Sequence, residues 1–196
     1  MTRKTDSFPA MRPVRLGVLL MLTLGTAFTV ARADAACTVI LSTANVQMGN
    51  VPVSSLRASG VPGYRLISTR NQTVNVRCNV PQATFRLELG GLIPIIGKPL
   101  VKWGTVGAMQ MRAMSATVAG IPVNLKLESS PAGVYAQEFD LTKNDIVNFD
   151  LSSVPLNNRK SFSLQLQLMG LLPESHAVRS KEVLESNISV QLLGAQ

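Results

Sequence analysis

The stretch "SFSLQLQLMG", residues 161–170, alternates apolar and polar side chains along its length. Phe162, Leu164, Leu166 and Leu168 fall on one face, with serine and glutamine residues between them. A period of two residues is typical of a β-strand that has one face buried and the other in water. This segment therefore predicts one strand of a half-buried antiparallel sheet.

The same alternation recurs along the chain. It is found in residues 37–41, 73–78, 85–89, 123–127 and 188–193. Turn residues such as Pro62-Gly63, Gly90-Gly91 and Asn157-Asn158 separate these segments, and no segment has a helical period over ten residues. Many short strands at this spacing predict an all-β fold, either an antiparallel sandwich or a barrel. We find no linker or repeat, so we expect one domain.

The first 35 residues have the pattern of an export signal. Arg12 and Arg15 precede the apolar run "LGVLLMLTLGTAFTV", and two small-x-small sites follow at residues 31–33 and 33–35. The apolar run is too short to serve as a stable membrane span. We expect residues 1–35 to be a signal peptide cleaved near Ala35, and residues 36–196 to form the mature domain. A further cleavage site follows Ala27, inside the apolar run.

Charge gives no indication of nucleic acid as a partner. Residues 36–196 contain 14 Lys/Arg and 9 Asp/Glu, and the basic residues are scattered rather than clustered. No basic patch is interleaved with aromatic residues, which nucleic-acid binding would favour. These charges are better interpreted as solvated faces of the strands.

Cys37 and Cys78 are the two cysteines of the chain. Export implies an oxidising compartment, so we expect them to form a disulfide. Free or metal-binding thiols are the alternative, but His176 is the single histidine and no Cys-x-x-Cys motif occurs. Closing this loop would stabilise the fold by about 4 kcal/mol in the chain-entropy model.

Catalytic and metal-binding motifs are scarce. No Gly-x-Ser-x-Gly elbow or phosphate-binding glycine loop occurs. Asp140, Asp145 and Asp150 recur every five residues, but this spacing differs from that of a calcium loop, and the apolar residues between them favour strand or turn burial. We therefore expect that the chain is not an enzyme, has no catalytic residue, and binds neither a cofactor nor a metal.

Residues 89–111, "LGGLIPIIGKPLVKWGTVGAMQM", are apolar, rich in glycine and proline, and contain the single tryptophan, Trp103. Two interpretations are open. We favour a buried strand interrupted by bends, with Trp103 in the core, because a lone aromatic residue is usually buried. The alternative is an exposed receptor surface formed by Ile95, Ile96 and Trp103.

The order of these features resembles subunits of bacterial pili assembled by the chaperone–usher pathway. A signal peptide precedes a cysteine in a first strand, and Val46-Gln47-Met48-Gly49-Asn50-Val51 is similar to the family's "V-x-F-G-x-V" segment, with Met48 in place of the aromatic residue. A second cysteine ends "TVNVRC", and the chain closes on the alternating segments "KSFSLQLQLMG" and "SNISVQLLGAQ".

This resemblance implies a six-stranded, incomplete immunoglobulin-like sandwich that lacks its last strand. The groove left by that strand would accept a strand from a periplasmic chaperone and then from a neighbouring pilus subunit, at an outer-membrane usher. The C-terminal Gln196 would anchor to basic residues of the chaperone. The residues implied at the groove are Thr38, Val39, Ile40, Leu41, Ile188, Val190, Leu192, Leu193 and Gln196.

The resemblance also implies a position in the fibre. Subunits of the shaft carry a donor segment before the first cysteine, but cleavage at Ala35 leaves one residue before Cys37. We therefore expect a structural subunit at the tip of a surface fimbrium, exported through the periplasm, with an adhesive role toward a host receptor. The alternative function is a free-standing secreted β-sandwich that binds a ligand.

Overall fold

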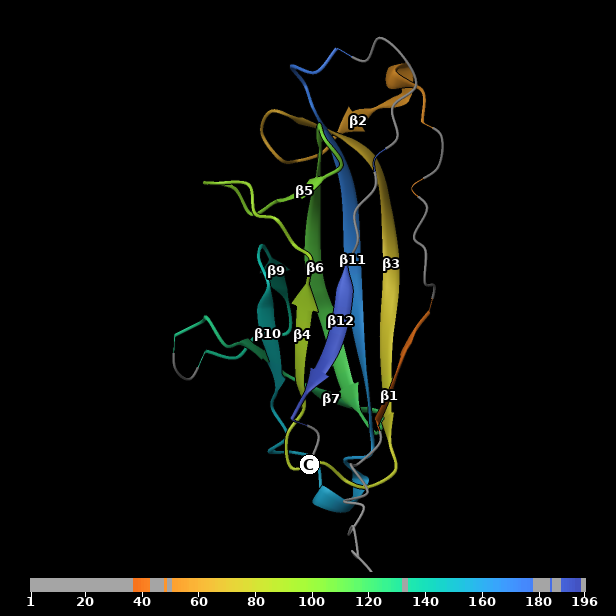
Figure 1. Ribbon diagram of the computed structural model, residues 1–196, viewed down its shortest axis with the longest axis vertical. Coiled ribbons are helices and arrows are strands. Elements are labelled where there is room, and N and C mark those ends of the chain that lie inside the picture. The colour runs from red at the N-terminus through yellow and green to blue at the C-terminus, as the bar shows by residue number, and fades with distance from the viewer. Residues whose placement is uncertain are drawn as a thin grey trace, which may run out of the picture. The chain divides into compact units, whose positions relative to one another are not determined.

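The computed structural model describes residues 37–42, 48, 51–131, 134–177, 184 and 188–194. All of them belong to one compact unit, Ala33–Gln196. The described chain forms two antiparallel β-sheets and two short 3-10 helices, η1 (Val53–Ser55) and η2 (Leu156–Asn158) (Figure 1). The expected all-β class is thus confirmed. The expected signal peptide lies outside the described residues.

In the described chain the first sheet has eight strands, and four of them follow one another in the spatial order β1 (Cys37–Leu41), β3 (Tyr64–Cys78), β11 (Ser161–Pro173) and β6 (Gly107–Val118). Three short strands pair with β6 on the side away from β11: β5 (Val101–Trp103), β9 (Phe139–Leu141) and β7 (Ile121–Val123). One more, β2 (Arg57–Ala58), pairs with β3. The predicted segments 73–78 and 161–170 are parts of the long neighbouring strands β3 and β11. These two strands pair from Arg77 opposite Ser161 to Tyr64 opposite Pro173.

The second sheet has the spatial order β12 (Ser189–Leu193), β4 (Arg86–Gly90), β10 (Asp145–Phe149) and β8 (Leu125–Leu127). The two sheets pack face to face, and their alternating inward side chains form one core. Three aromatic rings lie at its centre, because the centroids of Phe85, Phe149 and Phe162 are 4.4–6.3 Å apart. Phe85 directly precedes β4, Phe149 ends β10 and Phe162 belongs to β11, so this cluster joins the two sheets.

The predicted strand at residues 123–127 is divided between the sheets. Val123 pairs with Ala116 in the first sheet, whereas Leu125 pairs with Phe149 in the second. All three apolar residues of the segment are buried, as the alternation predicts. The chain crosses from one sheet to the other at Asn124. An alternating pattern predicts which side chains are buried, but it does not predict to which sheet each residue belongs.

The apolar segment 89–111 contains the connection from β4 to β5, in which residues 93–102 form a small hairpin, and the first residues of β6. Trp103 is 9% exposed and belongs to the main core, which confirms its interpretation as a core residue. Its ring lies over Gly170 of β11. A Cβ atom at Gly170 would lie 2.5 Å from Cζ3 and 3.0 Å from Cη2 of Trp103. The tryptophan therefore occupies the space that a side chain at position 170 would need.

This contact predicts the effect of Gly170→Ala on stability. The added methyl group has to displace a buried ring, so we expect the free energy of unfolding to fall by about 1–3 kcal/mol. Urea denaturation measures it. In the double variant Gly170→Ala/Trp103→Phe, the ring atoms that clash with the methyl group are absent. We therefore expect the double variant to lose less stability than the sum of the losses of the two single variants. Additive costs would contradict the contact.

Candidate functional site

Strand β1 forms one margin of the first sheet. Each of its residues from Cys37 to Leu41 pairs with β3. Cys37, Val39 and Leu41 are half-buried against the main core, whereas Thr38 and Ile40 are exposed. The strand thus has an inward apolar face and an outward face, and its inward side chains are only partly covered.

A disulfide holds β1 in this place. Cys37 and Cys78 are direct cross-strand partners, their Cα atoms are 4.0 Å apart, and their sulfur atoms are bonded. The expected pairing of the two cysteines is therefore confirmed. Because Cys78 ends the long strand β3, the bond fixes the start of β1 to a part of that strand where Val74 and Val76 are completely buried.

Strand β12 forms the corresponding margin of the second sheet. It pairs with β4 so that Val190 lies opposite Leu89 and Leu192 opposite Leu87. Both leucines of β4 are completely buried, but Val190 and Leu192 are half-buried, as is the preceding Ile188. The inward face of β12 is therefore covered less well than that of its neighbour.

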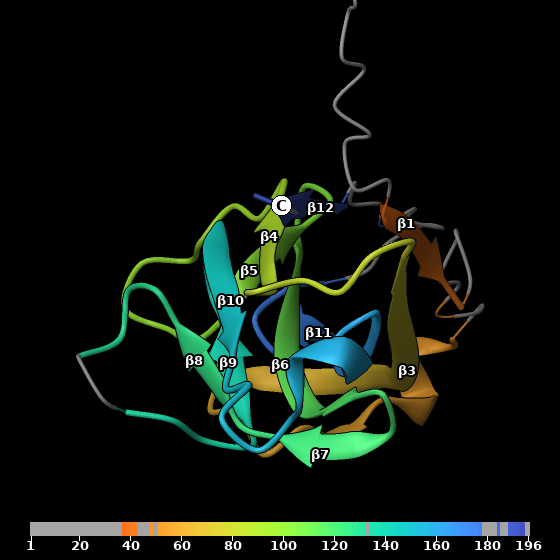
Figure 2. The same ribbon diagram turned by 90° about the horizontal axis from the view of Figure 1, so that it is seen from below.

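The margins formed by β1 and β12 lie next to each other, on the same side of the two sheets (Figures 1 and 2). Within the described part of the chain, β1 pairs only with β3 and β12 only with β4. Six of the ten partly buried apolar residues that pack on the main core gather here: Cys37, Val39, Leu41, Ile188, Val190 and Leu192. We call these six residues and the two facing strand edges the edge site.

The edge site can bind an extended segment of polypeptide. A strand edge presents unpaired N–H and C=O groups that can bond a further strand, and the half-buried apolar side chains can receive alternate side chains from it. Of the residues implied by the sequence, Thr38 and Ile40 face away from the core, and Leu193 is half-buried. Gln196 and residues 46, 47, 49 and 50 of the "V-x-F-G-x-V"-like segment lie outside the described residues.

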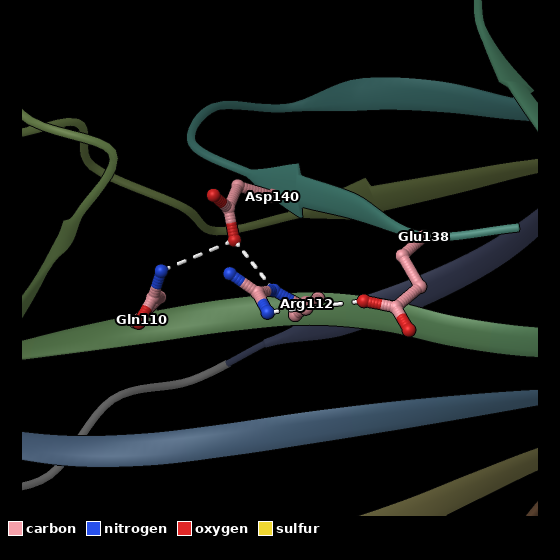
Figure 3. Close-up of polar contacts among 4 residues, drawn as sticks. All are labelled: Gln110, Arg112, Glu138 and Asp140. Atoms are coloured by element: carbon pink, nitrogen blue, oxygen red, sulfur yellow. Dashed lines mark hydrogen bonds and ion pairs between the residues drawn. The ribbon is translucent and has the colours of Figure 1, made fainter. Parts of the chain in front are cut away.

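The three aspartates at intervals of five residues have separate environments. Asp140 of β9 accepts hydrogen bonds from Arg112 Nε at 3.0 Å and from Gln110 Nε2 at 3.2 Å, both on β6 (Figure 3). Asp145 is buried and accepts hydrogen bonds from Ser129 and from the N–H of Ile146. Asp150 accepts one from the N–H of Ser152 at 3.1 Å.

The group around Asp140 holds β9 against β6. Its hydrogen bond to Arg112, and then its charge, raise the pKa of that guanidinium above the ordinary value, and Glu138 adds a weaker ion pair at 3.8 Å. The raised pKa means that the charged guanidinium is stabilised in the folded state, so deprotonation of Arg112 removes this contribution only as the pH rises through the arginine pKa. The four side chains in Figure 3 form hydrogen bonds and ion pairs with one another, so we interpret the group as structural.

Elsewhere, a shallow cavity of about 330 Å³ opens beside β7 and the start of the loop after β10. Its lining residues are Ser115, Ala116, Pro122, Val123, Asn124, Gln137, Asp150, Ser152 and Ser153. Asp150 is the one ionisable group among them, so this lining offers hydrogen bonds but no pair of nucleophile and base. Across the described ranges, no three acidic, histidine or cysteine side chains are grouped to hold a metal.

Comparison with protein-family models gave no match to this chain, and comparison with curated proteins gave none either. No helix in the described ranges is long and apolar enough to cross a membrane.

Removing the disulfide tests how strongly β1 is held. We expect Cys37→Ser/Cys78→Ser to lose about 4 kcal/mol of stability, because the bond closes a loop with a sequence separation of 41 residues. Urea midpoints under oxidising conditions measure this loss, and reduction of the wild-type protein should reproduce it. Equal midpoints for the variant and the oxidised wild type would show that the bond does not constrain β1.

Proposed function

We propose that this chain is a structural subunit of a bacterial surface pilus, assembled through the chaperone–usher pathway by donor-strand complementation. The observation that carries the proposal is the edge site. Two sheet edges with incompletely covered core residues lie side by side, and one inserted strand can cover both. An exposed edge of this kind is a site of aggregation unless a partner occupies it.

The order of the strands supports an incomplete immunoglobulin-like sandwich. In the complete fold, one sheet has the order A-B-E-D and the other C-F-G. In the proposed assignment, the sheet order β1, β3, β11, β6 corresponds to A, B, E and D, and the neighbours β4 and β12 correspond to C and F. The position of G would be the free edge of β12, beside β1. Strands β10 and β8 extend the second sheet on the other side of β4.

A donor strand at this position gains stability from two sources. Its backbone satisfies the free N–H and C=O groups of the edge, and its alternate side chains cover Val39, Leu41, Val190 and Leu192. Completing the burial of each of these four half-buried side chains contributes about 1 kcal/mol. In the periplasm the donor is a chaperone, and at the usher it is replaced by a segment of the neighbouring subunit.

The place of the subunit in the fibre follows from its processing. Cleavage at Ala35 leaves a chain that accepts a donor strand and has none to offer, which fits the tip of the fimbrium at the cell surface. An adhesive role toward a host receptor fits the same position. N-terminal sequencing of the exported chain tests the tip position, because a start at Phe28 would leave a donor segment and contradict it.

The edge site predicts how charge on β12 affects chaperone binding. Val190→Glu places a carboxylate between the two sheet edges, where an inserted strand would bury it, so we expect the variant to lose capture by the chaperone. The matched control is Gln191→Glu, one residue along on the exposed face of the same strand. It should bind as the wild type does. Co-purification from the periplasm with a tagged chaperone measures both.

The same preparation distinguishes a pilus subunit from a free-standing ligand-binding module. Expressed without a chaperone, the incomplete subunit should aggregate or be degraded, and chaperone co-expression should restore it. A wild-type chain that purifies alone as a stable, cooperatively folding monomer would refute the subunit proposal and favour the free-standing module. Equal capture of the Val190→Glu and Gln191→Glu variants would show that the chaperone binds elsewhere.

A further inference from the structure

Two loops carry an unusual share of the exposed apolar surface. Of the eight large apolar side chains that are exposed in the described residues, four lie on these loops. Ile93 and Ile96 are 57% and 97% exposed in the hairpin between β4 and β5, and Val134 and Tyr135 are 48% and 47% exposed between β8 and β9. Both loops project on the side of the sheets away from β1 and β3 (Figures 1 and 2).

The backbone of the first hairpin imposes the exposure of Ile96. The N–H of Ile95 donates to the carbonyl of Leu100 at 2.8 Å, and the N–H of Lys102 donates to that of Ile93 at 2.7 Å. The Ile95 side chain packs into a small second core with Leu100 and Tyr64. A well-bonded hairpin therefore holds one isoleucine inward and presents the next one to solvent.

The charges on the first loop are basic. Residues 89–111 contain Lys98 and Lys102 and no acidic residue. Lys98 Nζ lies 4.4 Å from the centroid of the Tyr64 ring, which keeps its charge beside the hairpin. Residues 129–137 of the second loop carry no charge.

The two acidic residues that flank the second loop are engaged in ion pairs. Glu128 pairs with Arg86 at 2.8 Å, and Glu138 pairs with Arg112 at 3.8 Å. The negative charge of Glu128 is thereby offset, whereas Glu138 shares Arg112 with Asp140, so one negative charge remains beside the second loop. The lysines lie on the first loop and its following strand, beside Ile93 and Ile96.

We propose that these two loops bind the surface of an anionic lipid bilayer. Ile93 and Ile96 enter the boundary between head groups and acyl chains, where apolar side chains are favoured. Tyr135 lies at the head-group level, as amphipathic aromatic rings do. Lys98 and Lys102 contact lipid phosphates, and each basic residue near an anionic surface adds about 1 kcal/mol.

A bilayer fits these tips better than a protein pocket does. The apolar side chains lie on two separate projecting loops rather than in one groove, and a deformable surface can meet both at once. Charge complementarity gives the preference for anionic lipid. Because only a few side chains enter the boundary, the binding is reversible. The proposal is independent of the pilus assignment, since the edge site lies on other strands.

Vesicle co-sedimentation tests the proposal on the chain isolated from the periplasm in its native complex. We expect binding to vesicles of phosphatidylcholine mixed with phosphatidylglycerol, weaker binding to phosphatidylcholine alone, and a fall in binding as salt increases. Ile96→Ser should weaken binding about tenfold, because a partly buried isoleucine is lost from the boundary. Since Ile96 is 97% exposed, this substitution should leave the fold intact.

The matched control is Leu156→Ser, which removes a comparable side chain, 54% exposed, from η2. It should bind as the wild type does. In an Ile96→Trp variant, emission should shift to shorter wavelength when anionic vesicles are added, while the buried Trp103 gives a constant background. Failure to bind anionic vesicles, equal losses in the two serine variants, or an unchanged emission spectrum would each overturn the proposal.

Discussion

The contact between the two inward sheet faces is the interaction on which the rest of this structure depends. Inward side chains of β3, β11, β6, β4 and β10 form the main core, and the rings of Phe85, Phe149 and Phe162 join the two sheets at its centre. Along the outer edge of β6, three short strands satisfy the backbone. Along β1 and β12 the same packing is incomplete, because the apolar side chains there are only half-buried. The edge site is thus a consequence of how the core is built.

This arrangement separates two tasks. The disulfide fixes β1 to the end of β3, so one lip of the edge site is held by a covalent bond while the other, β12, is held by pairing with β4. A strand added at these edges would extend the core. The loops that present Ile96 and Tyr135 project away from β1 and β3, so they stay free when the edge site is filled (Figure 2). Under the two proposals, subunit assembly and lipid binding would use different parts of the domain.

The strands with one solvent-exposed face and one buried face could be predicted from the sequence. Residues 73–78 and 161–170 alternate because β3 and β11 do so, and the disulfide followed from two cysteines and an export signal. The first five residues of β6, all buried, lie in the segment 89–111 that was interpreted as a buried strand interrupted by bends, whereas the rest of β6, residues 112–118, was missed. The change of sheet at Asn124 was not predicted, because alternation indicates which residues are buried and not which strands they pair with. For the edge site, the resemblance named the strands, but only the sheet order brings β1 beside β12. The outward direction of Ile96 depends on the hairpin's hydrogen bonds, which composition does not reveal.

The central claim is that a strand from another chain completes the sandwich at the edge site. Hydrogen exchange of the backbone amides of β12 tests it most directly, measured in the native periplasmic complex and in the chain stripped of its partner. The claim predicts that amides of Ser189–Leu193 not bonded to β4 are protected in the complex and lose this protection when the partner is removed, while the amides of β3 change little. Equal protection of β12 in both states would contradict the claim, because the chain would then complete its own fold.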